Sequence, residues 1–297
     1  MSNKAVIGVD IGGTTISIGV IQEGQLVKKM QLDTPAMESK QVIINVLLDG
    51  IEEISEGYTI EGVGIGVPGL LDAGNGIIYD LINIPSWNEV YLSDAVQARF
   101  KVDVYLANDA NCFAVGEKIY GGGARYKSIA GLALGTGLGV GFVFNGQLHT
   151  GIMSAAGEVG AIPYMLHNYE HYCSGKFFKK EFGLDGKTVF QKAMEGHEIS
   201  RGIFKQYGLH LGHLLKYLLH VVAPEAIFIG GSIKDAYPLF EESMWDVLHT
   251  FPYKRVIDNL VVEKSEMNEV AIMGAAAVCE MNIQIKENLS NHQGILH

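Results

Sequence analysis

Two stretches of the chain share one pattern, and this repeat decides the fold. The first is Ile11-Gly-Gly-Thr-Thr-Ile-Ser-Ile-Gly-Val-Ile-Gln-Glu-Gly-Gln-Leu26, and the second is Leu134-Gly-Thr-Gly-Leu-Gly-Val-Gly-Phe-Val-Phe-Asn-Gly-Gln-Leu148. In each stretch an apolar strand leads into a Gly/Thr turn and a second strand, and a further turn ends in Gly-Gln-Leu. We interpret the repeat as two homologous halves that face each other.

Glycine and threonine in these turns leave backbone N–H groups and hydroxyls free to bind phosphate oxygens. One such turn alone could equally be an ordinary hairpin, which also needs glycine. Two of them facing one cleft predict a site that holds the β and γ phosphates of a nucleotide. The residues of the two turns are Gly12, Gly13, Thr14, Thr15, Gly135, Thr136 and Gly137. Gly230 and Gly231, which follow a buried strand, would let the base and ribose lie against the backbone.

The stretch Ala107-Asn108-Asp109-Ala110-Asn111 closes an apolar strand and opens a helix. A carboxylate at the end of a buried strand lies where open α/β sheets bind ligands, which makes Asp109 a candidate catalytic base. The alternative is that Asn108 and Asp109 only stabilise the helix N-terminus, where both residue types are favoured.

Two other glycine motifs do not fit a nucleotide site. The segment Gly186-Lys187-Thr188 resembles the end of a Walker A loop, but Glu181 stands at the required first glycine and no strand precedes it. The segment 64–69 fits G-x-G-x-x-G but opens no helix. In the loop 82–88, Asn83 could line a sugar pocket, or the loop could lie on the surface.

Composition narrows the class of protein. A length of 297 residues predicts two domains, and 48% hydrophobic with 19% charged residues indicates a folded chain. The net charge of −11 without a basic tract makes nucleic acid an unexpected partner. Three widely spaced cysteines predict no disulfide framework. With no signal peptide and no apolar run long enough to cross a bilayer, we expect a cytoplasmic protein without a membrane partner.

Taken together and in order, five motifs resemble the ROK family of sugar kinases in the actin/hexokinase superfamily. The motifs are Asp10-Ile-Gly-Gly-Thr14, Asn108-Asp-Ala-Asn111, Leu134-Gly-Thr-Gly137, Ala156-Gly-Glu-Val-Gly160 and Ile229-Gly-Gly231. The resemblance implies an α/β fold of two RNase-H-like domains with a cleft between them, a homodimer, and transfer of the ATP γ-phosphoryl group to a sugar hydroxyl. We expect domains at 1–110 and 111–273, with a C-terminal helix from about 274 to 297 packed back on the first.

The resemblance also implies roles for individual residues. Asp109 would accept the proton of the sugar 6-hydroxyl, and Asp10 would orient Mg²⁺ through water. The sugar contacts implied are Gly69, Asn83, Asn108, Asp109, Glu158 and Glu181. Phosphoryl transfer depends mainly on positioning and charge neutralisation, so this set is chemically consistent.

The chain differs from the family at the positions of the structural zinc ligands. The family holds zinc with one histidine and three cysteines, but the four matching positions here are Ala161, Tyr172, Ser174 and Lys179. We therefore expect no structural zinc, although Cys173 and the nearby His167, Glu170 and His171 leave a rearranged metal site open.

The same departure bears on the substrate. In the family the zinc-bound histidine contacts the sugar near its anomeric carbon, so Ala161 should leave space for a substituent there. We expect a β-glucoside such as cellobiose, phosphorylated on its non-reducing glucose. Glucokinase, another hexose kinase and N-acetylmannosamine kinase are the alternatives. A sugar sensor without turnover is more remote, because the phosphate turns and Asp109 are present.

Overall fold

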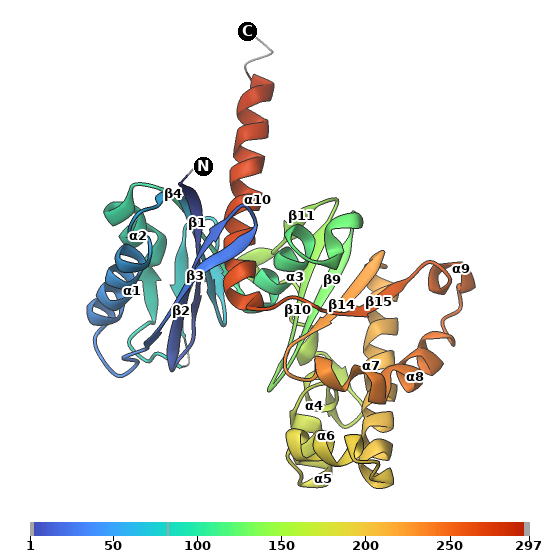
Figure 1. Ribbon diagram of the computed structural model, residues 1–297. Coiled ribbons are helices and arrows are strands. Elements are labelled where there is room, and N and C mark those ends of the chain that lie inside the picture. The colour runs from blue at the N-terminus through green and yellow to red at the C-terminus, as the bar shows by residue number, and fades with distance from the viewer. Residues whose placement is uncertain (1–2, 82, 294–297) are drawn as a thin grey trace.

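The computed structural model describes residues 3–81 and 83–293, which form two α/β lobes (Figure 1). Each lobe is built on a five-stranded sheet, with strand orders β3-β2-β1-β4-β8 and β11-β10-β9-β14-β15. The first sheet contains β1 (Lys4–Ile11), β2 (Thr15–Gln22), β3 (Gln25–Asp33), β4 (Thr59–Val67) and β8 (Asp103–Asn108). The second contains β9 (Ile129–Leu134), β10 (Leu138–Phe144), β11 (Gln147–His149), β14 (Ala226–Gly230) and β15 (Val261–Lys264).

The two sheets have the same connectivity, which confirms the two-lobed α/β fold. β1 pairs antiparallel with β2 and parallel with β4, just as β9 pairs antiparallel with β10 and parallel with β14. The following hairpins also agree, because both use two-residue turns with positive φ throughout. These φ angles are 50° at Glu23 and 73° at Gly24, and 50° at Asn145 and 79° at Gly146. Such angles suit the twist of a hairpin, so the repeated Gly-Gln-Leu marks equivalent positions.

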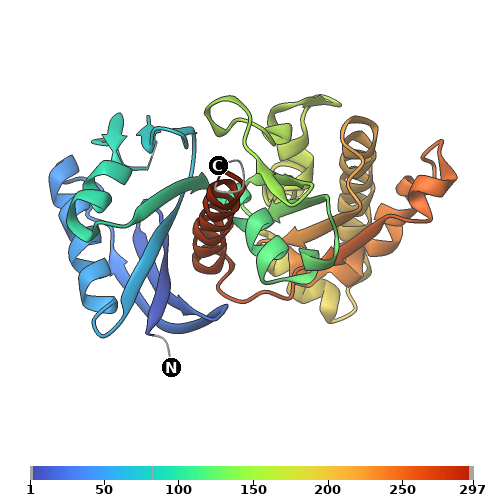
Figure 2. The ribbon, with the colours of Figure 1, turned by 90° about the horizontal axis from the view of Figure 1, so that it is seen from above.

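Two helices, α3 (Asp109–Ile119) and α10 (Val270–Gln293), lie between the sheets (Figures 1 and 2). Helix α10 approaches the first sheet so closely that side chains are excluded there. A Cβ atom at Gly64 would lie 1.8 Å from the Ala275 carbonyl oxygen, and one at Gly8 would lie 2.2 Å from that of Ile272. Glycines in β1 and β4 thus allow one helix to join both lobes.

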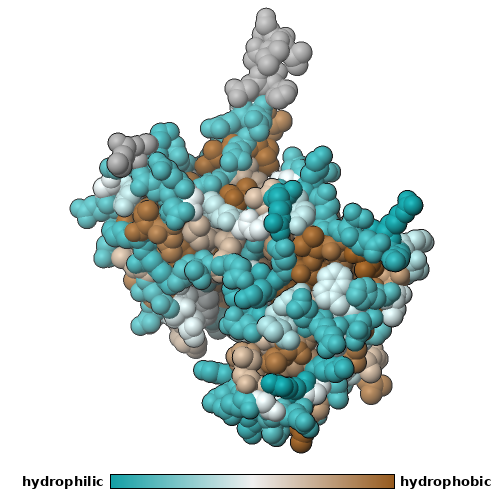
Figure 3. Space-filling view, turned by 45° about the vertical axis from the view of Figure 1, so that its right-hand side comes forward, coloured by the Kyte–Doolittle hydropathy of each residue, from teal (hydrophilic) through white to brown (hydrophobic). Residues whose placement is uncertain are grey.

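The C-terminal half of α10 extends beyond both lobes (Figures 1 and 3). The sequence predicted a C-terminal helix from about 274 to 297, and the structure describes α10 from Val270 to Gln293. Lys286 lies 2.7 Å from Asp103 in an ion pair that ties this half to β8. The domain boundaries at 110 and 273 remain a prediction.

The outer face of the first sheet is covered by α1 (Lys40–Ile54) and α2 (Leu92–Phe100) (Figure 1). Helix α2 has Tyr91 as its N-cap. A small sheet at the edge of the lobe contains β5 (Leu71–Asp72), β6 (Ile77–Tyr79) and β7 (Glu89–Tyr91).

The second lobe carries most of the remaining helices and one short hairpin. The helices are α4 (Tyr169–Cys173), α5 (Lys176–Phe182), α6 (Gly186–Met194), α7 (Glu198–Val221), α8 (Tyr237–Leu248) and α9 (Lys254–Ile257). The hairpin pairs β12 (Pro163–Tyr164) with β13 (His167–Asn168). Short 3-10 helices are η1 (Gly122–Arg125), η2 (Ile152–Ser154), η3 (Val159–Ala161) and η4 (Lys234–Ala236). Among the described residues, no helix combines the length and apolar character needed to cross a membrane.

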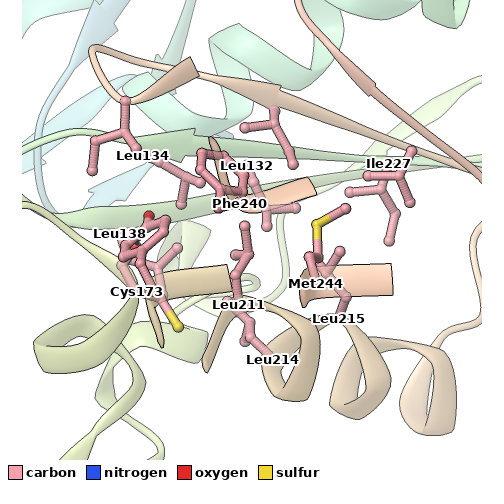
Figure 4. Close-up of a cluster of buried hydrophobic side chains, with 14 of the residues drawn as sticks. Leu132, Leu134, Leu138, Cys173, Leu211, Leu214, Leu215, Ile227, Phe240 and Met244 are labelled. Carbon is pink, nitrogen blue, oxygen red and sulfur yellow. Dashed lines mark hydrogen bonds between the residues drawn. The ribbon is translucent and has the colours of Figure 1, made fainter. Parts of the chain in front are cut away.

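The core of the second lobe anchors its Gly/Thr turn. Leu134 and Leu138, the residues on either side of that turn, point into the buried cluster that also holds Cys173 and Leu211 (Figure 4). Leu134 is fully buried and Leu138 is 8% exposed. Packing of both leucines therefore fixes the ends of the turn and leaves its backbone facing outward.

Candidate active site

The first Gly/Thr turn joins β1 to β2. The Gly12 N–H group donates to the Thr15 carbonyl at 2.8 Å, and the Thr34 hydroxyl donates to the Gly12 carbonyl at 2.8 Å. A Cβ atom at Gly13 would lie 2.5 Å from the Cβ atom of Asn83. The turn is therefore held from β3 on one side and touches the loop of Asn83 on the other.

The second Gly/Thr turn joins β9 to β10. The Gly135 N–H group donates to the Gly137 carbonyl at 3.0 Å, and the Gly175 N–H group donates to the Gly135 carbonyl at 2.7 Å. A Cβ atom at Gly175 would lie 3.0 Å from that same carbonyl oxygen. The start of α5 is thus attached directly to this turn.

Asn108 and Asp109 have separate tasks at the start of α3. The Asn108 side chain accepts a hydrogen bond from the Asn111 N–H group at 2.8 Å, so Asn108 is the N-cap. This confirms the capping role that the sequence left open for Asn108. Asp109 is not the N-cap of α3, and its carboxylate faces a cavity.

The environment of Asp109 favours its protonated form. Its side chain is open to the cavity but is enclosed by protein on its other sides, and this desolvation raises the pKa of Asp109. A hydrogen bond from the Ala110 N–H group, at 2.8 Å, opposes the shift. A carboxylate with a raised pKa is a stronger proton acceptor once it is ionised.

Asp10 lies near Asp109 at the end of β1. Burial raises the pKa of Asp10 to about 6, and repulsion from the Asp109 carboxylate adds to the shift. Two carboxylates from β1 and α3 therefore approach each other where the two lobes meet. Such a pair is a common feature of catalytic sites and of sites that receive a cation.

Two adjoining cavities lie along the second Gly/Thr turn. The smaller has a volume of about 410 Å³ and the larger about 920 Å³, and both are lined by Gly135 and Thr136. The predicted residues that line the smaller cavity are Gly69, Asn108, Asp109, Gly135, Thr136, Gly137, Glu158 and Gly231. Its size suits a sugar or a disaccharide unit, whereas the larger suits a nucleotide.

The larger cavity contains residues that sequence reasoning did not select. It is lined by the lysines Lys176, Lys179, Lys180 and Lys187 and by the aromatic residues Phe178, Phe190 and Phe204. Cations beside an apolar wall suit the phosphates and base of a nucleotide. The spacing of three of the lysines, on one face of α5, was a signal that could have found them. Lys187 belongs to the rejected Walker-like segment, which begins α6 after helix α5 instead of after a strand.

Several predicted residues line neither cavity. Among the described residues, Asp10, the first turn and Asn83 belong to the first lobe and line neither cavity. Gly230 is covered by Phe113, since a Cβ atom there would lie 2.5 Å from that ring. Gly231 does border the smaller cavity, with φ of 80°.

Glu181 is also outside both cavities. Its Oε1 atom lies 2.6 Å from Nε2 of His171, and the two side chains form a pair at the surface of α4 and α5. A different carboxylate, Glu170, borders the smaller cavity. Sequence reasoning did not assign Glu170 to the sugar site, because its place beside the cavity depends on the packing of α4 against distant segments.

The four positions that match the family's zinc ligands carry no histidine and no cysteine. Ala161 has no ligand atom, and the buried Tyr172 and Ser174 offer none of the histidine or thiolate groups that structural zinc prefers. Elsewhere in the described chain, ligand atoms of His167, His171 and Glu181 lie within 4.8 Å of one another. The rings of the two histidines are stacked at 4.0 Å.

Two repeated lobes, each with a Gly/Thr turn, define a protein of the actin/hexokinase type. The model of the ROK family matches residues 6–282, and the chain therefore belongs to the ROK family, as its motifs predicted. It is similar to glucokinase of Thermotoga maritima, with 31% identity over 95% of this chain and 99% of that protein. It is also similar to N-acetyl-D-glucosamine kinase of Escherichia coli, with 30% identity over 84% and 91%.

A solved structure shares both the fold and part of the sequence. The ROK family glucokinase of Streptomyces griseus, in complex with glucose and AMPPNP, superposes with a TM-score of 0.73. Its identity to this chain is 26%, over 92% of this chain and 98% of that one.

Proposed function

We propose that the protein is an ATP-dependent sugar kinase that transfers the γ-phosphoryl group to the 6-hydroxyl of a glucosyl unit. The position of Asp109 carries the proposal. Its carboxylate borders the smaller cavity, which meets the larger one at Gly135 and Thr136. A sugar hydroxyl in the smaller cavity and a triphosphate in the larger cavity would meet beside this carboxylate.

Asp109 acts as the general base in this proposal. It accepts the proton of the 6-hydroxyl as the oxygen attacks the γ-phosphorus, and ADP leaves. The raised pKa of Asp109 supports this role, because proton transfer to a stronger base is more favourable. General-base help of this kind contributes about 10²–10⁴-fold to a rate.

Asp10 would hold Mg²⁺ through water molecules, and this ion would neutralise charge on the phosphates. The raised pKa of Asp10 fits that task, since a nearby cation would favour the ionised carboxylate. In this proposal the two Gly/Thr turns belong to different lobes, and closure of the lobes would bring both turns onto the phosphates. Closure would also exclude water and limit ATP hydrolysis.

The proposed sugar contacts are Gly69, Asn83, Asn108, Glu158 and Glu181. Gly69, Asn108 and Glu158 have the strongest support because all three border the cavity. Gly157 has φ of 98° and would place a Cβ atom 1.8 Å from the Val140 carbonyl, so only glycine fits before Glu158. A sugar role for Glu181 would require its carboxylate to leave His171.

We propose a β-glucoside such as cellobiose as the favoured substrate. Ala161 ends the short helix η3 directly after Glu158, is exposed, and carries only a methyl group where the family has histidine. A second sugar attached at the anomeric carbon would find space there. Free glucose is the second candidate, and the name of the Thermotoga maritima relative favours it.

Release of ADP in the presence of Mg²⁺ and ATP, with cellobiose and glucose each varied in concentration, tests the proposal. A higher kcat/KM for cellobiose supports a β-glucoside kinase, and a higher value for glucose supports a glucokinase. Absence of turnover with these sugars, other hexoses and N-acetylmannosamine would refute the proposed activity.

A further inference from the structure

We infer that Glu170 is a sugar-binding residue that determines specificity, and that Lys176 positions it. This inference rests on the proposed function, which it deepens by naming a carboxylate outside the family's motifs. Glu170 begins α4, and its carboxylate borders the same cavity as Asp109 and Glu158. Glu181, to which the family resemblance assigns a sugar contact, is held by His171 outside that cavity.

The Glu170 side chain is packed between the two motifs that form the cavity wall. A Cβ atom at Gly137 would lie 2.8 Å from Oε2 of Glu170, and one at Gly160 would lie 3.3 Å from its Cβ atom. Glycine at both positions leaves the space that this side chain occupies. The carboxylate is consequently held against the Gly/Thr turn on one side and the Glu158 motif on the other.

Both oxygens of Glu170 have a defined partner. Oε2 accepts a hydrogen bond from the Leu138 N–H group at 3.3 Å, and Oε1 forms an ion pair with Nζ of Lys176. The Ser174 hydroxyl donates to the Glu170 carbonyl at 2.7 Å, which fixes the backbone. An ionised carboxylate has about four acceptor positions, so each oxygen can still accept a sugar hydroxyl. The side chain is 30% exposed, which leaves it accessible from the cavity.

The two charged residues, Glu170 and Lys176, border different cavities. Gly137, Leu138 and Glu170 border only the smaller cavity, whereas Lys176 borders only the larger one. The carboxylate is thus in the same cavity as Asp109 and Glu158, and it accepts a hydrogen bond from the residue that follows the turn. The Lys176 ammonium group is on the nucleotide side, where it can also attract phosphate. The ion pair therefore connects the two substrate sites.

The positive charge of Lys176 reduces the electrostatic repulsion between the Glu170 carboxylate and a nearby phosphate group. Lys176 neutralises Glu170, so its negative charge does not add to that of Asp109 and Asp10. Without Lys176, the carboxylate would repel an incoming triphosphate and would lose one of the two contacts that orient it. Lys176 is accordingly a positioning residue for sugar binding, with an additional attraction for the nucleotide.

Glu170→Gln tests the inference, with Glu242→Gln on the exposed side of α8 as a control and Glu181→Gln as a comparison. We expect sugar KM to rise about 10- to 100-fold in Glu170→Gln, as for loss of a hydrogen bond to a charged group. The KM for ATP should change less than about 3-fold, because Glu170 borders only the sugar cavity. The loss should be greater than in Glu181→Gln and absent in Glu242→Gln.

Monodeoxy sugars distinguish a direct contact from a structural effect. If Glu170 binds one hydroxyl, the penalty of Glu170→Gln should disappear for the analogue without that hydroxyl and persist for the others. An equal penalty for every analogue, a larger effect on the KM for ATP than on that for sugar, or a greater loss in Glu181→Gln would each overturn the inference. Wild-type turnover, measured first, tests the proposed activity separately. If there is none, calorimetric titration of the same variants with the sugars still tests Glu170.

Discussion

Replacing Asp10 by asparagine should stabilise the unliganded protein while it reduces turnover. The pKa of Asp10 is raised from 3.8 to about 6, so ionisation is less favourable in the folded than in the unfolded chain. The protonated form stabilises the fold below pH 3.8, and this stability is lost as the pH rises through about 6. A shift of about 2 pKa units corresponds to about 3 kcal/mol, which asparagine would recover at pH 8 because it does not ionise.

The pH dependence makes this prediction specific. At pH 5 the folded Asp10 is still mostly protonated, and the same linkage predicts a cost of only about half that size. The advantage of Asp10→Asn should therefore grow by roughly 1 kcal/mol between pH 5 and pH 8.

Urea unfolding at both pH values, without nucleotide or Mg²⁺, measures the difference. Asp246→Asn, at an exposed position of α8, serves as a control and should change stability by less than about 0.5 kcal/mol. A destabilised Asp10→Asn protein at pH 8, or a difference that does not vary with pH, would refute the account of Asp10.

The other predictions concern the reaction, the substrate and the metal. Asp109→Asn should reduce kcat by about 10²–10⁴-fold and leave calorimetric sugar binding nearly unchanged, and near-normal turnover would eliminate Asp109 as the base. Wild-type kcat/KM should fall on acidification at a pH above 3.8, because the pKa of Asp109 is raised. Ala161→His should lower kcat/KM for cellobiose relative to glucose by about 10-fold, whereas Ala161→Gly should not. Elemental analysis should find well under one zinc atom per chain. Stoichiometric zinc that is lost in His171→Ala would contradict this and place a metal beside His171.

The repeated halves were predictable because their signals are local. A Gly/Thr turn followed by a strand and a two-residue hairpin is specified by residues within about fifteen positions of one another. The cap at Asn108 is equally local, since its side chain binds an N–H group three residues later. The C-terminal helix that the sequence placed from about 274 begins four residues earlier, at Val270.

The choice among carboxylates was not predictable in the same way. Family alignment selected Glu181 by its distance from a glycine motif, but Glu170 borders the cavity. The sequence could not show that the Gly175 N–H group binds the Gly135 carbonyl, which lies forty residues earlier. That contact brings the start of α5 to the Gly/Thr turn, while Glu181, at the other end of the same helix, faces His171.

The sequence by itself determined the two α/β halves, their Gly/Thr turns, the position of Asp109 at a strand end and the membership of the ROK family. Only the tertiary structure decided which side chains share a cavity: Glu170 with Asp109 and Glu158, and four lysines with the second Gly/Thr turn. The physical reason is the separation along the chain of the residues that interact. Turns and caps are set by hydrogen bonds between near neighbours, whereas a cavity depends on packing between elements far apart in the chain.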